Sequence, residues 1–253
     1  MSNIKVGLIL AAGNGRRIAS VSGDLPKPLV ELHGRPLLEH VLLGASEAGI
    51  QHFVVVVGYG ANAIRSWLAG RSLDGPRITL VENCEYGKDN GVSVLKARDK
   101  INEPFMLLMA DHIFEPETAA SLLEEHIRED ETILAVDYKL DRLFDIDDAT
   151  KVACSNGFII DIGKQITTYN AADTGMFLCT PAIFSSLESK MKNGNCSLSD
   201  GMRDMARRRK LRAFDIGDGL WQDVDTPEAL AYAKKVFPVP YRSYEVAEEI
   251  HSV

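Results

Sequence analysis

The chain has 253 residues, 45% of them hydrophobic and 25% charged, which is typical of one large globular α/β domain or of one domain with a modest insertion. Its formal net charge of -8 disfavours a general nucleic-acid binder, since such proteins normally carry a basic face. No apolar run approaches the roughly 18 residues of a membrane span, and the four cysteines lack the spacing of a zinc site or disulfide framework, so we expect a cytoplasmic protein with reduced thiols.

Short apolar runs alternate with helical patterns through the first half of the chain. The run from 54 to 57 is continuous valine, which favours a strand buried on both faces of a parallel sheet. The predicted strands are 5–10, 53–57, 77–81, 105–109 and 132–136, and the predicted helices are 36–48, 61–69, 92–100 and 116–128. This alternation predicts right-handed crossovers and a doubly wound, mostly parallel sheet.

The regular alternation of strand and helix patterns ends at about residue 137. A hairpin is predicted over 151–162, with Ser155-Asn156-Gly157 as its turn, and a further strand over 175–179. Helices over 181–190 and 197–209 and a strand over 211–216 follow, and a last helix begins at Pro227 with Thr226 as its cap. We therefore expect a single domain over 1–237 with a small β insertion at about 138–180, followed by a tail, 238–253, that is either a docking arm or disordered.

A glycine-rich segment directly follows the first predicted strand. It reads Leu10-Ala11-Ala12-Gly13-Asn14-Gly15-Arg16-Arg17, and Leu25-Pro26-Lys27-Pro28-Leu29 comes after it. Small residues let the backbone approach a nucleotide closely, and its N–H groups can hold phosphate oxygens. Arg16 and Lys27 add the positive charge that a triphosphate needs.

Other glycine-rich loops fit this segment less well. A Walker A loop requires G-x-x-x-x-G-K-S/T, which is absent. A dinucleotide-binding fingerprint requires a helix that starts directly at the glycines and an acidic residue near the end of the second strand. Here about twenty residues separate Gly15 from the next helical pattern, and Val57-Gly58-Tyr59-Gly60 contains no acid. The alternative interpretation is a glycine-rich turn that binds no ligand. The positive charges of Arg16 and Lys27 disfavour it.

The two segments together resemble the signature of the sugar-phosphate nucleotidyltransferases, roughly L-A-A-G-x-G-x-R followed by P-K-P-L. The resemblance implies a Rossmann-like nucleotidyltransferase fold of the glycosyltransferase-A type. It implies that the glycine-rich loop wraps a nucleoside triphosphate and that Arg16 and Lys27 contact its phosphates as catalytic groups. The loop residues expected to bind the nucleotide are Leu10, Ala11, Ala12, Gly13, Asn14 and Gly15.

Acidic residues in two segments are candidates for a metal site. Asp111 follows the apolar strand 105–109, and ligands of open α/β sheets lie beyond the carboxyl ends of the strands. A carboxylate there can bind Mg²⁺ that bridges phosphates; the alternative is a turn or helix-capping aspartate. Relatives often carry a second metal-binding acid before their last helix, which implies Asp225, with Asp223 in reserve, although Asp225 could also only cap that helix.

A polar loop after the third predicted strand fits base and ribose recognition, with a plain loop and a cap at Asn90 as the alternative. Its candidate residues are Asn83, Lys88, Asn90, Gly91 and Ser93. This loop and the stretches 147–152, 162–164 and 173–177 resemble the inositol-1-phosphate cytidylyltransferases. That implies CTP and inositol 1-phosphate as substrates and CDP-inositol and pyrophosphate as products.

The same resemblance implies roles at the acceptor. Lys151 and Lys164 would bind the acceptor phosphate, Asp173 a ring hydroxyl, and His112 adjoins the expected metal site. Cations for the phosphate and acceptors for the hydroxyls are what a polyol phosphate requires. The alternative is a pair of surface lysines on a hairpin.

Several alternatives stay open. Some such cytidylyltransferases are fused to a membrane domain that uses the product; none follows here, so we expect the product to reach a separate protein, or a different acceptor. Choline phosphate, aminoethylphosphonate and sugar 1-phosphates fit the same motifs, and so does a catalytically silent nucleotide-sensing subunit. The oligomeric state, a homodimer included, is open. The basic run 203–210 is typical of a solvated helix face.

Overall fold

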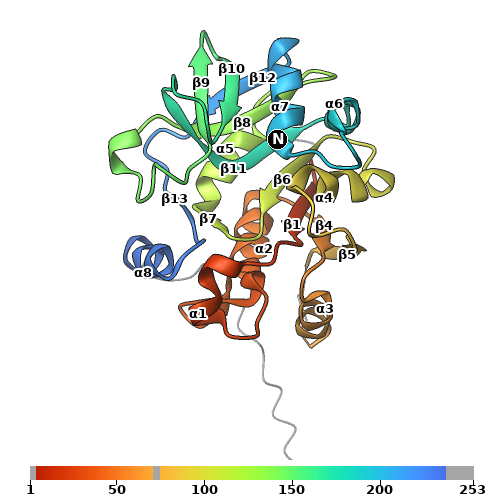
Figure 1. The fold of residues 1–253 in the computed structure, drawn as a ribbon, viewed down its shortest axis with the longest axis vertical. Helices are drawn as coiled ribbons and strands as arrows, with labels where there is room; N and C mark the ends of the chain where they lie inside the picture. The colour runs from red at the N-terminus through yellow and green to blue at the C-terminus, as the bar shows by residue number, and fades with distance from the viewer. Residues whose placement is uncertain (1–3, 71–74, 238–253) are drawn as a thin grey trace, which may run out of the picture.

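The structure, a computed structural model, describes residues 4–70 and 75–237, and a nine-stranded mixed sheet forms the centre of this part (Figure 1). The strand order is β5-β4-β1-β6-β11-β8-β12-β10-β9. Its strands are β1 (Val6–Ala11), β4 (His52–Val57), β5 (Arg77–Glu82), β6 (Phe105–Met109), β8 (Thr132–Asp137), β9 (Lys151–Ser155), β10 (Phe158–Gly163), β11 (Ala171–Cys179) and β12 (Leu211–Asp215). No helix in 4–70 or 75–237 has the length and apolarity needed to cross a membrane.

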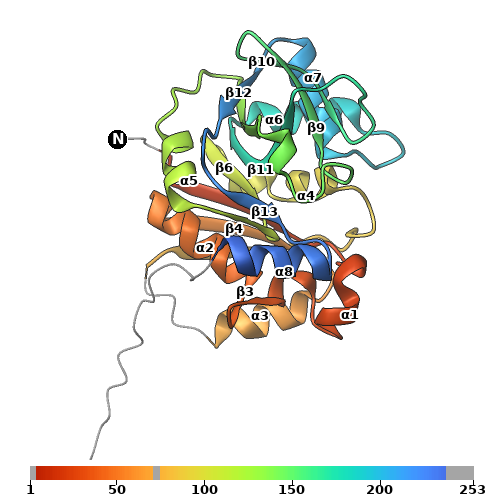
Figure 2. The same cartoon turned by 90° about the vertical axis from the view of Figure 1, so that its left-hand side faces the viewer.

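Helices cover both faces of the sheet (Figure 2). One face packs against α4 (Asn90–Lys96), α6 (Ala182–Lys190) and α7 (Leu198–Arg207), and the other against α2 (Leu37–Ala48), α3 (Ala61–Ala69) and α5 (Pro116–Leu123). β5, β4, β1 and β6 run parallel, and the valines from 54 to 57 in β4 are fully buried, as expected for an inner strand covered on both faces. The predicted doubly wound α/β fold is confirmed.

The second half of the chain completes the sheet with antiparallel pairings and with one parallel pair, β12 and β8. The β9–β10 hairpin turns at Asn156 and Gly157, which both have positive φ, as a tight hairpin turn requires. The last helix, α8 (Pro227–Val236), starts where predicted, because the Thr226 side chain accepts a hydrogen bond from the Ala229 backbone. The expected tail, 238–253, lies outside the described residues.

Two helices differ from their predicted bounds by more than two residues at one end. α4 begins at Asn90 and ends at Lys96, and a separate 3₁₀ turn follows at Arg98–Lys100. α5 ends at Leu123, and beyond it Ile127 packs back against the core. Local periodicity cannot mark these ends, because contacts with other elements decide them.

A small second sheet was not predicted and bears directly on the site. β7 (His112–Phe114) and β13 (Trp221–Asp223) pair antiparallel, with Asp223 opposite His112. The Val224 amide also donates a hydrogen bond of 3.0 Å to the Asp111 carbonyl. The two acidic segments, far apart in sequence, therefore lie side by side. The remaining elements are α1 (Ala19–Ser22), the short hairpin β2 (Glu31–Leu32) and β3 (Arg35–Pro36), and the 3₁₀ turns Arg16–Ile18, Lys27–Leu29 and Leu140–Arg142.

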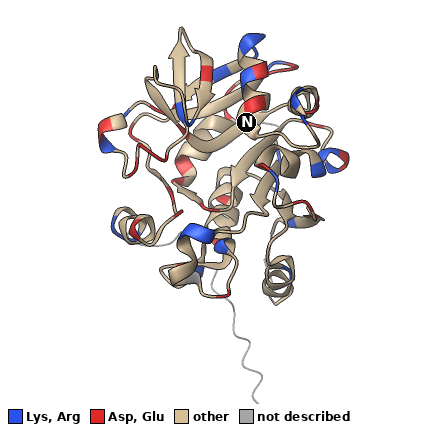
Figure 3. Cartoon of the chain, viewed as in Figure 1, with Lys and Arg blue, Asp and Glu red and all other residues tan. Residues whose placement is uncertain are grey.

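The basic run at the end of α7 is largely paired with acids, and Figure 3 shows both signs of charge along that helix. Arg208 pairs with Asp204 at 3.1 Å, and Lys210 pairs with Asp130 at 2.9 Å. This mixture fits the predicted solvated helix face rather than a nucleic-acid patch.

Candidate active site

Three carboxylates surround the ammonium group of Lys27. Its Nζ lies 2.5 Å from Asp111 Oδ2 and 3.7 Å from Asp223 Oδ1, and it also forms an ion pair with Asp225. The Lys27 side chain is only 6% exposed, so these interactions are weakly screened by water. Pro26 precedes Lys27 with φ -65° and leads it into the 3₁₀ turn that aims it at the acids.

His112 lies beside the same acids. Its Nδ1 is 2.9 Å from Asp111 Oδ1 and 3.8 Å from Asp223 Oδ1. Burial alone would lower the pKa of His112, but the neighbouring carboxylates of Asp223 and Asp111 outweigh it and raise that pKa to about 8. Burial alone would raise the pKa of Asp111, but Lys27 and His112 hold it well below its usual range. At neutral pH His112 is therefore protonated and Asp111 is ionised.

The carboxylates form two groups that could hold a metal ion. The ligand atoms of Asp111, His112 and Asp223 lie within 4.8 Å of one another, and so do those of Asp148, Asp223 and Asp225. Within the described ranges, Oδ1 of Asp223 is buried without a hydrogen-bond partner, which is costly unless a cation is bound there. Carboxylate oxygens are the ligands that hard divalent cations prefer, whereas a protonated His112 cannot ligate one.

The glycine-rich loop borders a pocket of about 280 Å³ that ends at these acids. Gly15 has φ 57°, and a Cβ there would lie 2.5 Å from the Cβ of Lys27, so only glycine fits. The lining residues are Leu10, Ala11, Gly13, Asn14, Gly15, Arg16, Arg17, Lys27, Pro28, Ala110, Asp111 and Asp225. Ala12, also expected to bind nucleotide, is buried below the loop, and its carbonyl accepts a hydrogen bond from the Tyr59 amide.

Arg17, which the sequence analysis did not select, reaches the acids directly. It pairs with Asp225 and, at 2.5 Å, with Asp148, whereas Arg16 lines the pocket and forms no ion pair within 4–70 and 75–237. A signal for Arg17 was present: when Gly13 is the first glycine of L-A-A-G-x-G-x-R, the arginine of the signature falls on Arg17.

A larger cavity of about 420 Å³ meets the glycine-loop pocket at Asp111 and Asp225, which line both. Three expected acceptor-binding residues line it: His112, Lys164 and Asp173. Burial raises the pKa of Asp173 to about 6, and its Oδ1 accepts a hydrogen bond of 2.8 Å from the Gly175 amide. Lys164 Nζ lies 3.0 Å from Asp148 Oδ1.

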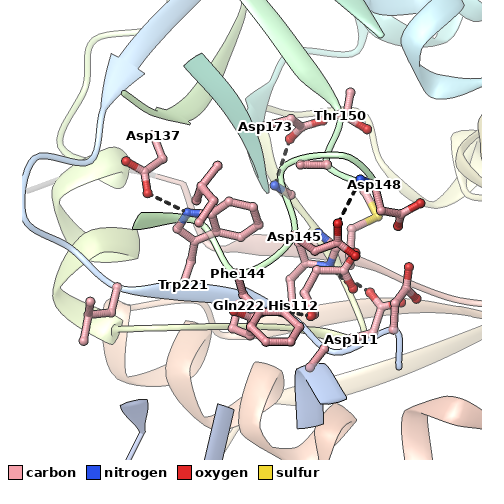
Figure 4. A pocket seen from close by; sticks show the side chains of 18 of the residues that line it. Asp111, His112, Asp137, Phe144, Asp145, Asp148, Thr150, Asp173, Trp221 and Gln222 are labelled. Atoms are coloured by element: carbon pink, nitrogen blue, oxygen red, sulfur yellow. Dashed lines mark hydrogen bonds and ion pairs between the residues drawn. The ribbon is translucent and has the colours of Figure 1, made fainter. Parts of the chain in front are cut away.

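Several other side chains in this cavity were not foreseen (Figure 4). They include Asp137, Lys139, Arg142, Phe144, Asp145, Asp148, Trp221 and Tyr232. Phe144 stacks on Tyr232 with ring centroids 4.8 Å apart, and so joins the 138–150 loop to α8. Asp137, Trp221 and Tyr232 lie on β8, β13 and α8, and the other five residues lie in the 138–150 segment. Local sequence pattern does not link these segments, so only the fold brings them together.

The structure does not bring Lys151 into the cavity. Its side chain is buried, and Nζ donates hydrogen bonds to the carbonyls of Asp147 at 3.0 Å and Ala149 at 3.4 Å. The group therefore holds the loop before β9 in place.

Residues of the 83–93 loop contact one another and α7. Asn83 is buried and donates to the Ser93 hydroxyl at 3.0 Å, and Lys88 pairs with Glu85. Asn90 accepts a hydrogen bond of 2.8 Å from the Leu198 amide and also lines the larger cavity. A Cβ at Gly91 would lie 2.6 Å from the Cys196 carbonyl oxygen, so glycine permits this close approach.

Curated relatives match most of this chain. It is 30% identical over 233 residues to the bifunctional IPC transferase and DIPP synthase of Aquifex aeolicus, an alignment that covers 92% of this chain and 51% of the relative. It is 32% identical over 230 residues to the protein of the same name from Rubrobacter xylanophilus, covering 90% and 51%. The chain thus spans about half the length of these relatives.

Solved structures agree with the fold. The inositol-1-phosphate CTP transferase from T. maritima superimposes with a TM-score of 0.81 at 27% identity, over 93% of this chain and 98% of that one. A UDP-glucose pyrophosphorylase complexed with UDP-glucose gives a TM-score of 0.78 over the same shares, but at 21% identity it supports the fold alone.

The family comparison covers almost the whole domain, since residues 7–238 match the MobA-like NTP transferase domain. The resemblance to nucleotidyltransferases drawn from the sequence motifs is confirmed by this match and by the relatives above. The chain belongs to the family of MobA-like NTP transferase domains.

Proposed function

We propose that this chain transfers the cytidylyl group of CTP to inositol 1-phosphate, or to a similar phosphorylated alcohol, and releases pyrophosphate. The observation that carries the proposal is the convergence of Lys27, Asp111 and Asp223 where the glycine-loop pocket meets the larger cavity. The names of these relatives, among them an inositol-1-phosphate CTP transferase, favour CTP and an inositol phosphate over other substrates.

The proposed reaction is an in-line displacement without a covalent enzyme intermediate. An oxygen of the acceptor phosphate forms a bond to the α-phosphorus of CTP, and the bond from that phosphorus to the bridging oxygen breaks, so that pyrophosphate leaves. Lys27 and Arg17 would neutralise phosphate oxygens in the transition state. His112 and Lys164 would hold the acceptor phosphate, and Asp173 would accept a hydrogen bond from an alcohol hydroxyl.

We assign a magnesium site to Asp111 and Asp223. The buried Oδ1 of Asp223 has no hydrogen-bond partner, and Lys27 Nζ is 3.7 Å away, which supports this choice. Asp225, the acid preferred from the sequence, forms ion pairs with both Lys27 and Arg17. When bound, Mg²⁺ supplies positive charge to the phosphate oxygens. Asp225 would then orient the two cationic side chains toward the triphosphate.

A substrate matrix tests the proposal. CTP, UTP, ATP and GTP would each be combined with inositol 1-phosphate, choline phosphate, 2-aminoethylphosphonate and glucose 1-phosphate in Mg²⁺, with inorganic pyrophosphatase converting product to phosphate. We expect the fastest phosphate release with CTP and inositol 1-phosphate. Thermal stabilisation by CTP without turnover for any acceptor would instead identify a nucleotide-sensing subunit.

Two variants test the assigned residues. Lys27→Ala and Asp111→Asn should each lower kcat by about 10² or more, because each removes a charge that faces the reacting phosphates. Lys100→Ala and Asp99→Asn change exposed residues of the 3₁₀ turn after α4 and serve as matched controls. Wild-type rates in both site variants would refute the assignment.

A further inference from the structure

The imidazole of His112 is packed against two parts of the larger cavity wall. It stacks on the indole of Trp221, with ring centroids 5.9 Å apart and planes inclined by 18°. It also touches the backbone of Gly175, where a Cβ would lie 2.4 Å from His112 Cδ2 and where φ is 77°. Gly175 therefore leaves room for this ring, which any other residue would displace.

Trp221 is itself fixed from the main sheet. Its Nε1 donates a hydrogen bond of 2.9 Å to Asp137 Oδ2, at the end of β8, and a dashed line in Figure 4 marks this contact. Asp137 is 3% exposed, and Lys139 Nζ lies 2.8 Å from its other oxygen. A buried, charge-assisted hydrogen bond of this kind holds the indole in one orientation.

The pairing of β7 with β13 explains why these rings meet. Asp223 stands opposite His112 in this register, so Trp221, two residues before Asp223, is a diagonal neighbour of His112 on the same face. The stack directs Nδ1 of His112 toward Asp111 Oδ1, 2.9 Å away, and leaves it 3.8 Å from Asp223 Oδ1.

We propose that Trp221 is a positioning residue, which clamps His112 beside Asp111 and Asp223 so that its imidazole faces the acceptor phosphate. The consequence for the reaction rests on the proposed function, whereas the clamp itself does not. A small displacement of a positioned charge can lower a reaction rate about 10²-fold, so a loosened ring should lower kcat without weakening CTP binding.

The experiment compares Trp221→Leu with Trp221→Phe. Leucine removes the flat ring, and we expect kcat to fall by about 10-fold to 10²-fold while KM for CTP stays within about twofold. Phenylalanine keeps an aromatic ring on His112, although it loses the N–H donor and one of the two fused rings, so it should recover most of the lost kcat. Thermal unfolding of each variant monitors folding.

A double-mutant cycle separates positioning from general structural damage. If Trp221 acts through His112, adding Trp221→Leu to His112→Asn should cost little further kcat, since coupled residues are non-additive. Multiplied losses in the double variant would overturn the proposal. A Trp221→Leu protein with wild-type kcat would do the same.

The second readout needs no turnover. Carbethoxylation of His112 by diethyl pyrocarbonate, followed by peptide mass spectrometry, should be several-fold faster in Trp221→Leu than in Trp221→Phe or the wild type, with exposed His126 as internal reference. Equal His112 reactivity in all three proteins would contradict the clamp. If His112 were carbethoxylated faster in Trp221→Leu but the wild type turned over no substrate pair, the clamp would stand and the proposed function would be refuted.

Discussion

We expect the proton bound by His112 to stabilise the folded protein. The pKa of His112 is raised from the ordinary 6.5 to about 8, because Asp223 and Asp111 outweigh the effect of burial. The folded protein therefore binds this proton more tightly than the unfolded chain does. That stabilisation is fully present below about pH 6.5 and is lost as pH rises through about 8. A shift of this size corresponds to about 2 kcal/mol.

In chelator-treated protein, we expect the free energy of unfolding to fall between pH 6 and pH 9. The fall should be about 2 kcal/mol larger than in a variant that lacks His112. Urea unfolding at a series of pH values measures it. His112→Gln should remove this component of the slope, whereas His126→Gln, at an exposed histidine, should keep it. An undiminished slope in His112→Gln would contradict the raised pKa.

The sequence predicted which residues lie together at the candidate site more reliably than the direction of their side chains. Lys27 and Asp111 were foreseen because each occupies a position with a local signal, a specific motif for one and the carboxyl end of a buried strand for the other. The sequence did not distinguish Asp223 from Asp225, because the direction of each side chain depends on β7–β13 pairing and on partners distant in the chain. Arg17 was missed although the arginine of the signature falls on it. Lys151 shows the same limit, since its burial follows from the path of the preceding loop.

At the scale of elements, the best predictions were those with a clear local pattern. β6 and α3 have the predicted bounds, because β6 is a continuous apolar run and α3 carries a helical period with Ala61 and Ile64 buried. β7 and β13, at three residues each, carry none. Those two short strands place Asp223 beside Asp111. Sequence periodicity therefore could not predict the two elements that bring the acids of the site together.

The cap of α8 gives an element-scale prediction. The Thr226 hydroxyl accepts a hydrogen bond of 3.1 Å from the Ala229 amide, directly after the acidic segment of β13. Thr226→Ala should lower the free energy of unfolding by about 1 kcal/mol, and Thr226→Ser should restore most of it. Chemical denaturation measures both, with Thr167→Ala at an exposed loop position as the matched control. Equal stability of the Ala and Ser variants would show that the cap contributes nothing.

At the scale of the whole molecule, the site exists only in the folded chain. The parallel half of the sheet carries the glycine-rich loop, the mixed half carries the larger cavity, and Arg17 joins them by pairing with Asp148. The groups that would bind CTP and Mg²⁺ come from segments as far apart as Gly15 and Asp225. An unfolded chain cannot assemble them, so ligand binding should stabilise the folded state almost fully.

This linkage predicts the effect of metal removal. With Mg²⁺ present, CTP at about 100 times its Kd should add about 2.7 kcal/mol to the free energy of unfolding, a rise in Tm of roughly 5 to 10 °C for a chain of this size. A chelator should abolish most of the rise, because Asp111 and Asp223 would no longer share a cation with the triphosphate. Asp111→Asn should show little metal-dependent rise, and Asp99→Asn the full one. If CTP stabilised the protein equally with and without chelator, these carboxylates would not be the metal ligands, and Lys27 and Arg17 alone would account for nucleotide binding.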